Sequence, residues 1–224
     1  MKRLALVAIV LVSFAAVALA DQINFNFTIG GANSVVATSA GGLTAGPSML
    51  TSISDTTTNV NVPFTGTFVN ANTGPAFSLV PIGPPPTIVG SFAGLGGTSV
   101  LVVDAANNVL VSGSMQPNAS VLSPLPGGSG SFLGTFDVSF VSPAALALFG
   151  LGPTFQPIGS VAFTFANASF DGTTLTAAIG GGAVTIQTPA APPPIPEPAG
   201  LGILGVGLTA IAEIARRWRA SPRP

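Results

Sequence analysis

The stretch from Gln22 to Ile29, QINFNFTI, alternates polar and apolar side chains at every position and stops at Gly30-Gly31. Successive side chains of a β-strand point to opposite faces, so this alternation predicts a half-buried strand. Eleven further short runs, rich in Val, Phe, Thr and Ile and separated by turn-forming residues, predict further strands. They cover residues 35–39, 49–54, 60–69, 77–82, 87–92, 99–103, 109–115, 132–141, 161–170, 175–179 and 183–187.

The turns between these runs indicate an antiparallel arrangement. Asp171-Gly172 is a strong hairpin signal, and residues 104–108 have the composition of a longer turn. A Ser-Pro start and a Gly end predict one short helix over residues 142–150. Because no helix is long enough for a crossover between parallel strands, we expect residues 21–188 to form one all-β, antiparallel β-sandwich or jelly-roll-like domain.

The amino terminus has the pattern of a secretory signal peptide. Lys2-Arg3 precede an uncharged run that ends in Ala18-Leu19-Ala20, ahead of Asp21. A positive start, a short apolar run and small residues at the cleavage positions are typical of a segment that signal peptidase removes. We therefore expect residues 1–20 to be cleaved after Ala20.

Charge is distributed very unevenly along the chain. All six basic residues lie at the two ends, and residues 21–195 contain five Asp and no Lys, Arg, His, Glu or Cys. The expected exported domain thus has a formal charge of minus five, although the whole chain has minus one. Binding to nucleic acid requires clustered Lys or Arg, so nucleic acid is not an expected partner. The absence of Cys excludes disulfides and thiolate metal sites.

The carboxyl terminus contains a second targeting pattern. Residues 189–198 are rich in Pro and end in Pro196-Glu197-Pro198, residues 199–215 are apolar, and Arg216-Arg217-Trp218-Arg219 begins the basic segment 216–224. At 1.5 Å per residue, the apolar run gives a helix of about 26 Å, which is just long enough to span a bilayer. Positive residues stay on the cytoplasmic side, so Arg216, Arg217 and Arg219 predict a stop-transfer signal, with the domain facing outward.

This order of a Pro-rich stalk, Pro-Glu-Pro, an apolar run and an arginine cluster resembles the PEP-CTERM sorting signal of exported proteins in Gram-negative bacteria. The resemblance covers about residues 195–219. It implies that Pro196, Glu197 and Pro198 are recognised by exosortase, a membrane-embedded processing enzyme. It further implies an inner-membrane-anchored precursor whose domain is later released or transferred to the cell surface, in bacteria that produce exopolysaccharide and biofilm.

The exported region contains few residues suited to catalysis. Without His, Cys or Lys, a Ser or Thr nucleophile has only a carboxylate to activate it, and we expect no catalytic residue and no cofactor. A glycosidase would need two of the five Asp residues to lie about 5 to 9 Å apart, which the sequence leaves open. Asp104, Asn107 and Asn108 could also gather around Ca²⁺, although no EF-hand spacing is present.

The sequence therefore predicts an exported, non-enzymatic surface or matrix protein, with extracellular polysaccharide or further copies of the chain as candidate partners. The alternative is a weak carbohydrate-binding or carbohydrate-processing domain, although the exported region has no Trp or Tyr for stacking on sugars. A third possibility is a tail-anchored protein that is never cut.

Overall fold

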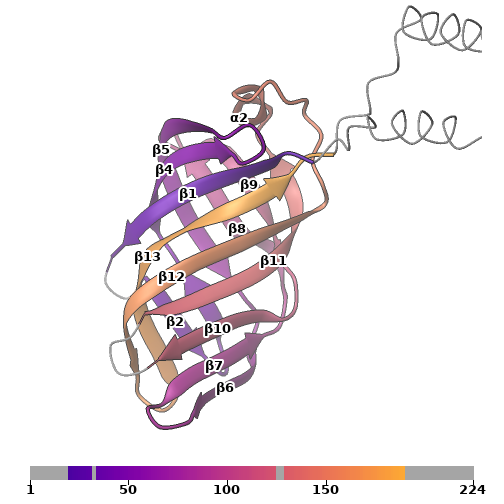
Figure 1. The fold of residues 1–224 in the computed structure, drawn as a ribbon. Helices are drawn as coiled ribbons and strands as arrows, with labels where there is room; N and C mark the ends of the chain where they lie inside the picture. The colour runs from indigo at the N-terminus through magenta and orange to yellow at the C-terminus, as the bar shows by residue number, and fades with distance from the viewer. Residues whose placement is uncertain (1–19, 32–33, 125–128, 190–224) are drawn as a thin grey trace, which may run out of the picture. The chain divides into compact units, whose positions relative to one another are not determined.

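The computed structural model describes residues 20–31, 34–124 and 129–189, which form thirteen antiparallel strands and one short helix (Figure 1). The elements are β1 (Gln22–Gly30), β2 (Val35–Thr38), β3 (Gly42–Ala45), β4 (Ser48–Asp55), β5 (Val60–Asn72), β6 (Ala76–Ile82), β7 (Thr87–Phe92), β8 (Leu95–Asp104), β9 (Val109–Met115), β10 (Ala119–Pro124), β11 (Gly130–Val141), α2 (Pro143–Ala147), β12 (Ile158–Phe170) and β13 (Thr174–Gln187).

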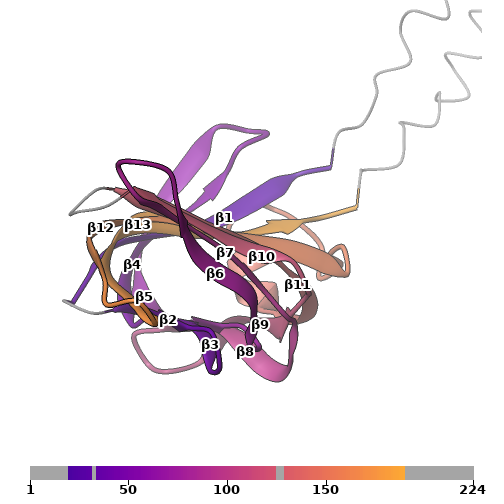
Figure 2. The same cartoon turned by 90° about the horizontal axis from the view of Figure 1, so that it is seen from below.

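Eight of these strands pair in a closed ring, in the order β1, β4, β5, β8, β9, β11, β12 and β13, with β13 returning to β1 (Figure 2). The all-β, antiparallel prediction is therefore confirmed. The predicted arrangement as a β-sandwich or jelly roll is wrong, because the pairings close into one barrel. The Asp171-Gly172 hairpin is confirmed as the connection between β12 and β13.

Strand β13 shows why the barrel closes. Residues 175–179 and 183–187, predicted as two strands, belong to one strand that continues through Gly180, Gly181 and Gly182. From Leu175 to Thr185 one edge of β13 pairs with β12, while its other edge pairs first with β2 and then, from Gly181, with β1. Gly181 has a φ of +149°, which side-chain-bearing residues rarely adopt, so the glycine run lets the strand change neighbours without ending.

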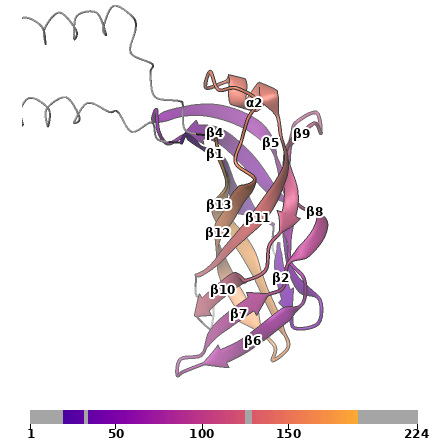
Figure 3. The same ribbon diagram turned by 90° about the vertical axis from the view of Figure 1, so that its right-hand side faces the viewer.

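The remaining strands extend the barrel at the end away from α2. At that end, β2 pairs with β13 and with β3, and β3 pairs with β5. Nearer α2, the strands between β13 and β5 are β1 and β4. Strands β10, β7 and β6 extend from β11, and β6 pairs only with β7 among the described strands (Figure 3). The sequence did not predict β3 or β10, and it placed the start of β8 four residues too late. The predicted helix is confirmed but is shorter, over Pro143–Ala147.

Apolar side chains fill the interior of the barrel. Phe27 stacks on Phe68 with ring centroids 4.2 Å apart, and Phe132 stacks on Phe163 at 4.8 Å. These rings lie in one core cluster with inward-facing residues from every strand of the ring. An eight-stranded barrel is just wide enough for side chains to fill it, so binding groups must be sought on its outer wall and at its ends.

Small hydroxyl side chains satisfy buried backbone amides where the pairing is irregular. The Ser99 hydroxyl accepts a hydrogen bond from the Met115 amide at 2.6 Å, beside the register shift between β8 and β9. The Ser34 hydroxyl accepts one from the Ile179 amide at 2.8 Å, where β13 is shifted against β12. An unpaired buried amide is costly, so these serines stabilise the bulges that bend the wall.

Among residues 20–31, 34–124 and 129–189, no helix combines the length and apolar character needed to cross a membrane. The predicted transmembrane segment, residues 199–215, lies outside the described residues, as do the stalk from residue 190 onward and the basic tail. Those parts of the domain organisation stay predictions.

Candidate functional site

The residues predicted to direct sorting lie outside the described part of the chain. They are Pro196, Glu197 and Pro198 of the sorting motif, Arg216, Arg217 and Arg219 of the stop-transfer signal, and Ala18 at the predicted signal cleavage site. Ala20, the last residue of the predicted signal peptide, is the first residue described. The candidate site must therefore be sought on the barrel itself.

The aspartates are spread over the barrel. Asp21 precedes β1, Asp55 ends β4, Asp104 ends β8, Asp137 lies within β11, and Asp171 lies in the hairpin between β12 and β13. Within the described ranges, no group of three or more acidic, His or Cys side chains could hold a metal ion. The fold thus brings no metal-binding cluster together there.

Asp104 and Asp171 each organise their own turn. One Asp104 carboxylate oxygen accepts hydrogen bonds from the amides of Ala106 and Asn108, both at 2.8 Å, and the other accepts from the Asn108 side chain. The Asn108 side-chain and backbone donors lower the pKa of Asp104, and desolvation opposes them. Backbone donation from Thr173 and Thr174 likewise lowers the pKa of Asp171. A lowered pKa keeps both groups ionised and is opposite to what a general acid requires.

The same contacts bear on the suggested Ca²⁺ site at Asp104, Asn107 and Asn108. The Asn108 side chain turns its amide nitrogen, rather than its oxygen, towards the Asp104 carboxylate. Asn107 adopts a φ of +65° and donates its backbone N–H to the Asp104 carbonyl. The three residues form a hydrogen-bonded turn, and its carboxylate is already occupied by three donors.

Asp55 and Asp137 also accept hydrogen bonds from neighbouring residues. Asp55 is 1% exposed, and its carboxylate accepts hydrogen bonds from the Thr57 amide and the Thr58 hydroxyl in the β4–β5 turn. Asp137 is exposed and accepts a hydrogen bond from the Gln116 side chain at 2.8 Å. Burial of Asp55 was not predicted, because nothing in its local sequence distinguishes it from the exposed turn aspartates.

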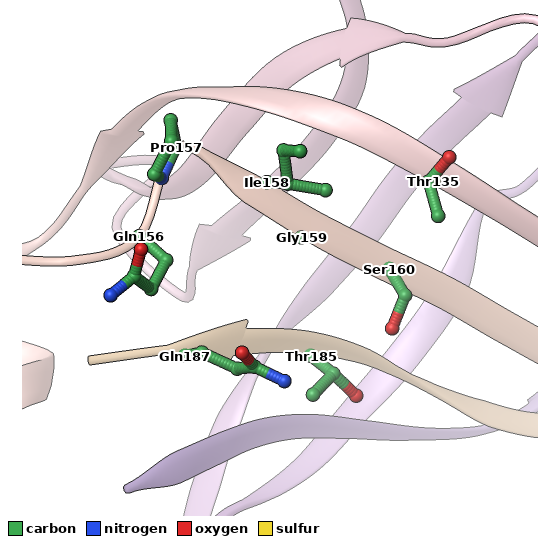
Figure 4. Close-up of a pocket in the computed structure, with 8 residues that line it drawn as sticks. All are labelled: Thr135, Gln156, Pro157, Ile158, Gly159, Ser160, Thr185 and Gln187. Atoms are coloured by element: carbon green, nitrogen blue, oxygen red, sulfur yellow. The ribbon is translucent and has the colours of Figure 1, made fainter. Parts of the chain in front are cut away.

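A groove on the outer wall is a concave feature available for binding. It has a volume of about 360 Å³ and lies over β11, β12 and β13 (Figure 4). The groove forms where β12 separates from β13: the Gln156 amide donates to the Gln187 carbonyl, and regular pairing resumes at Ser160 and Thr185. Between these two links, one segment has three residues (157–159), whereas β13 has only one, Ile186.

Neutral polar groups surround this groove. Its lining residues are Thr135, Gln156, Pro157, Ile158, Gly159, Ser160, Thr185 and Gln187. The Ser160 hydroxyl and the side-chain amides of Gln156 and Gln187 make no hydrogen bond to another described residue, and Figure 4 shows Ser160 and Gln187 directed over the space between β12 and β13. Ile158, 50% exposed, and Pro157 provide an apolar border.

A row of polar side chains crosses the wall and passes through the groove. From β5 to β9 the register aligns Asn61, Ser54, Asn24, Thr185, Ser160, Thr135 and Gln116 side by side. Thr185 donates to Asn24 at 2.7 Å, and Thr135 donates to Gln116 at 3.0 Å. We call these seven residues the polar row. The sequence analysis missed it, because Ser, Thr and Asn at alternate strand positions carry no individual signal and only the register aligns them.

Searches for matching protein-family models, curated proteins and solved structures found none for this chain.

Proposed function

We propose that this chain is an exported, non-enzymatic surface or matrix protein, sorted through a carboxyl-terminal PEP-CTERM-like signal. Signal peptidase would remove residues 1–20 and an exosortase would act at Pro196-Glu197-Pro198. The barrel would be anchored in the inner membrane as a precursor and would then reach the cell surface or its surroundings, among exopolysaccharide or biofilm.

The observation that supports the non-enzymatic part is that most of the carboxylates are held by structural hydrogen-bond partners. Four of the five aspartates in the expected exported domain are hydrogen-bonded to neighbours of their own turn or wall. The region has no His, Cys or Lys that could serve as base or nucleophile. A barrel whose core is filled by apolar side chains and whose wall groove is lined by uncharged residues supports a role in binding or display rather than in turnover.

The sorting part is supported by the position of the barrel ends. The Asp21 carbonyl accepts a hydrogen bond from the Thr188 amide at 2.9 Å, so the first and last described strands end side by side. The described chain therefore begins and ends at neighbouring positions, and the strand pairing of the barrel involves no residue before Gln22 or after Gln187.

Intact-mass measurement of the protein isolated from an exporting host that contains an exosortase tests this proposal. We expect a chain that starts at Asp21 and ends close to Glu197. A chain that starts at Asp21 and still ends at Pro224 would contradict processing and favour the permanently tail-anchored alternative. A chain that retains residues 1–20 would contradict the signal peptide.

A further inference from the structure

We propose that the groove over β11, β12 and β13, together with the polar row that crosses it, binds a neutral polysaccharide. The inference deepens the proposed function. It rests on that function only for the location of the protein, among extracellular polysaccharide. The ligand chemistry itself is argued from the groove.

The free polar groups of the groove match the hydroxyl groups of a sugar. The side-chain amides of Gln156 and Gln187 each offer two donors and one acceptor, and the Ser160 hydroxyl offers both functions. Hydroxyl-rich ligands need such mixed, neutral partners, whereas a phosphate or carboxylate needs an excess of donors and positive charge. With only uncharged side chains lining it, the groove satisfies the first requirement and fails the second.

The net charge of the barrel is a second reason why an acidic polymer should not bind. Residues 21–195 have five negative charges and no positive side chain, so an acidic polysaccharide would meet repulsion without any compensating ion pair. One carboxylate, Asp137, lies on the same wall and pairs in register with Ile158 at the groove border. A neutral polymer is not repelled by it and can accept the groove's hydrogen bonds.

The shape of the site suits an extended chain rather than a compact small molecule. The groove is open along the wall, and the polar row continues beyond it through Asn24 on one side and Gln116 on the other. Neighbouring strands lie about 4.8 Å apart, so hydrogen-bonding groups recur at about that spacing across six neighbouring strands and on to Gln116, which follows β9. Ile158 and Pro157 supply apolar contact for the C–H faces of a sugar ring, in a domain without Trp or Tyr.

Calorimetric titration of the full chain in detergent tests the site. The neutral probes are cellohexaose, dextran and a linear mannan, and the acidic probe is alginate. We expect at least one neutral probe to bind and alginate not to bind. The double variant Ser160→Ala, Gln187→Ala should weaken neutral binding about tenfold, because it removes two free hydrogen-bonding groups.

The matched control is Ser131→Ala, Ser169→Ala, which removes two exposed hydroxyl groups from β11 and β12 outside the groove. It should bind as the parent chain does, and circular dichroism should show the same strand content in all three proteins. Failure of all neutral probes, equal binding by both double variants, or equally tight alginate binding would each overturn the inference. Export and trimming are measured separately by mass, so either proposal can fail while the other stands.

Discussion

The hydroxyl of Thr185 in β13 donates a hydrogen bond to the side-chain oxygen of Asn24 in β1 at 2.7 Å. The two residues are 161 positions apart and lie directly opposite each other in the register of the first and last strands. This contact therefore lies on the seam that closes the barrel and also within the polar row. Closure of the fold and assembly of the candidate binding surface depend on the same strand pair.

Gly182 allows β13 to pass close to β12. A Cβ at Gly182 would lie 2.3 Å from the Ala162 carbonyl oxygen and 2.5 Å from Cβ of Phe163. We expect Gly182→Ala to lower the free energy of unfolding by about 1 to 3 kcal/mol, the usual cost of overpacking. Urea denaturation measures it. Gly152→Ala is the matched control, because its Cβ would meet nothing within 4 Å; equal stability of the two variants would contradict the tight approach.

Ser99 supplies the acceptor for a buried amide. Ser99→Ala leaves the Met115 N–H without its 2.6 Å partner, so we expect a loss of about 1 to 3 kcal/mol in the free energy of unfolding. Ser120→Ala removes an exposed hydroxyl from β10 and should change stability by less than about 0.5 kcal/mol. Chemical denaturation of both variants would show a difference; similar curves would mean that the bulge amide finds another partner.

The carboxyl groups of Asp104 and Asp171 should make the free energy of unfolding depend on pH in the acidic range. Both have a native pKa lowered from 3.8 by hydrogen bonds within their turns. Their contribution is fully present above the unfolded pKa and is lost as the pH falls through the lowered native values. We expect Asp104→Asn, Asp171→Asn to flatten the decline in unfolding free energy below about pH 4. An unchanged slope from pH 5 to pH 2 would show that these turns contribute nothing to acid sensitivity.

Glu197 should be needed for processing but not for export. The signal peptide and the apolar segment 199–215 insert without it, so Glu197→Ala should leave translocation intact and block trimming of the tail. Immunoblotting and intact mass of the cell-associated protein would show the uncut chain. The matched control is Glu213→Ala, which removes an acidic residue outside the tripeptide. Normal trimming of the Glu197→Ala variant would contradict the PEP-CTERM assignment.

The arginines should hold the tail in its orientation. Changing Arg216, Arg217 and Arg219 together to Gln leaves Arg223 as the only positive charge after the apolar run. We expect weaker membrane retention, or passage of the tail across the membrane, because the orientation bias rests on these side chains. Protease accessibility of the tail in spheroplasts measures this. The same protection pattern in variant and parent would contradict a stop-transfer role.

Local sequence pattern was sufficient to predict most strands. The alternation in Gln22 to Ile29 and the Asp171-Gly172 turn specify local conformation, and each needs only neighbouring residues to be recognised. Strand β5 continues through Pro63, although proline has no backbone N–H to donate, and Pro63 pairs in register with Ser52. Strand β3, GLTA, begins with a glycine and has one large apolar residue, Leu43, so it lacks the Val-Val pair by which the equally short β2 was recognised.

The sequence by itself determined that the domain is all-β, acidic, without Cys, and free of the residues that most catalysis requires. Only the tertiary structure decided that the strands close into a barrel and that Ser160, Thr185 and Gln187 meet at one groove. The physical reason is that a sandwich and a barrel use the same period-two alternation and the same turns. They differ in which distant strands pair, and the pairing of Asn24 with Thr185 across 161 residues is set by packing of the whole core rather than by any local pattern.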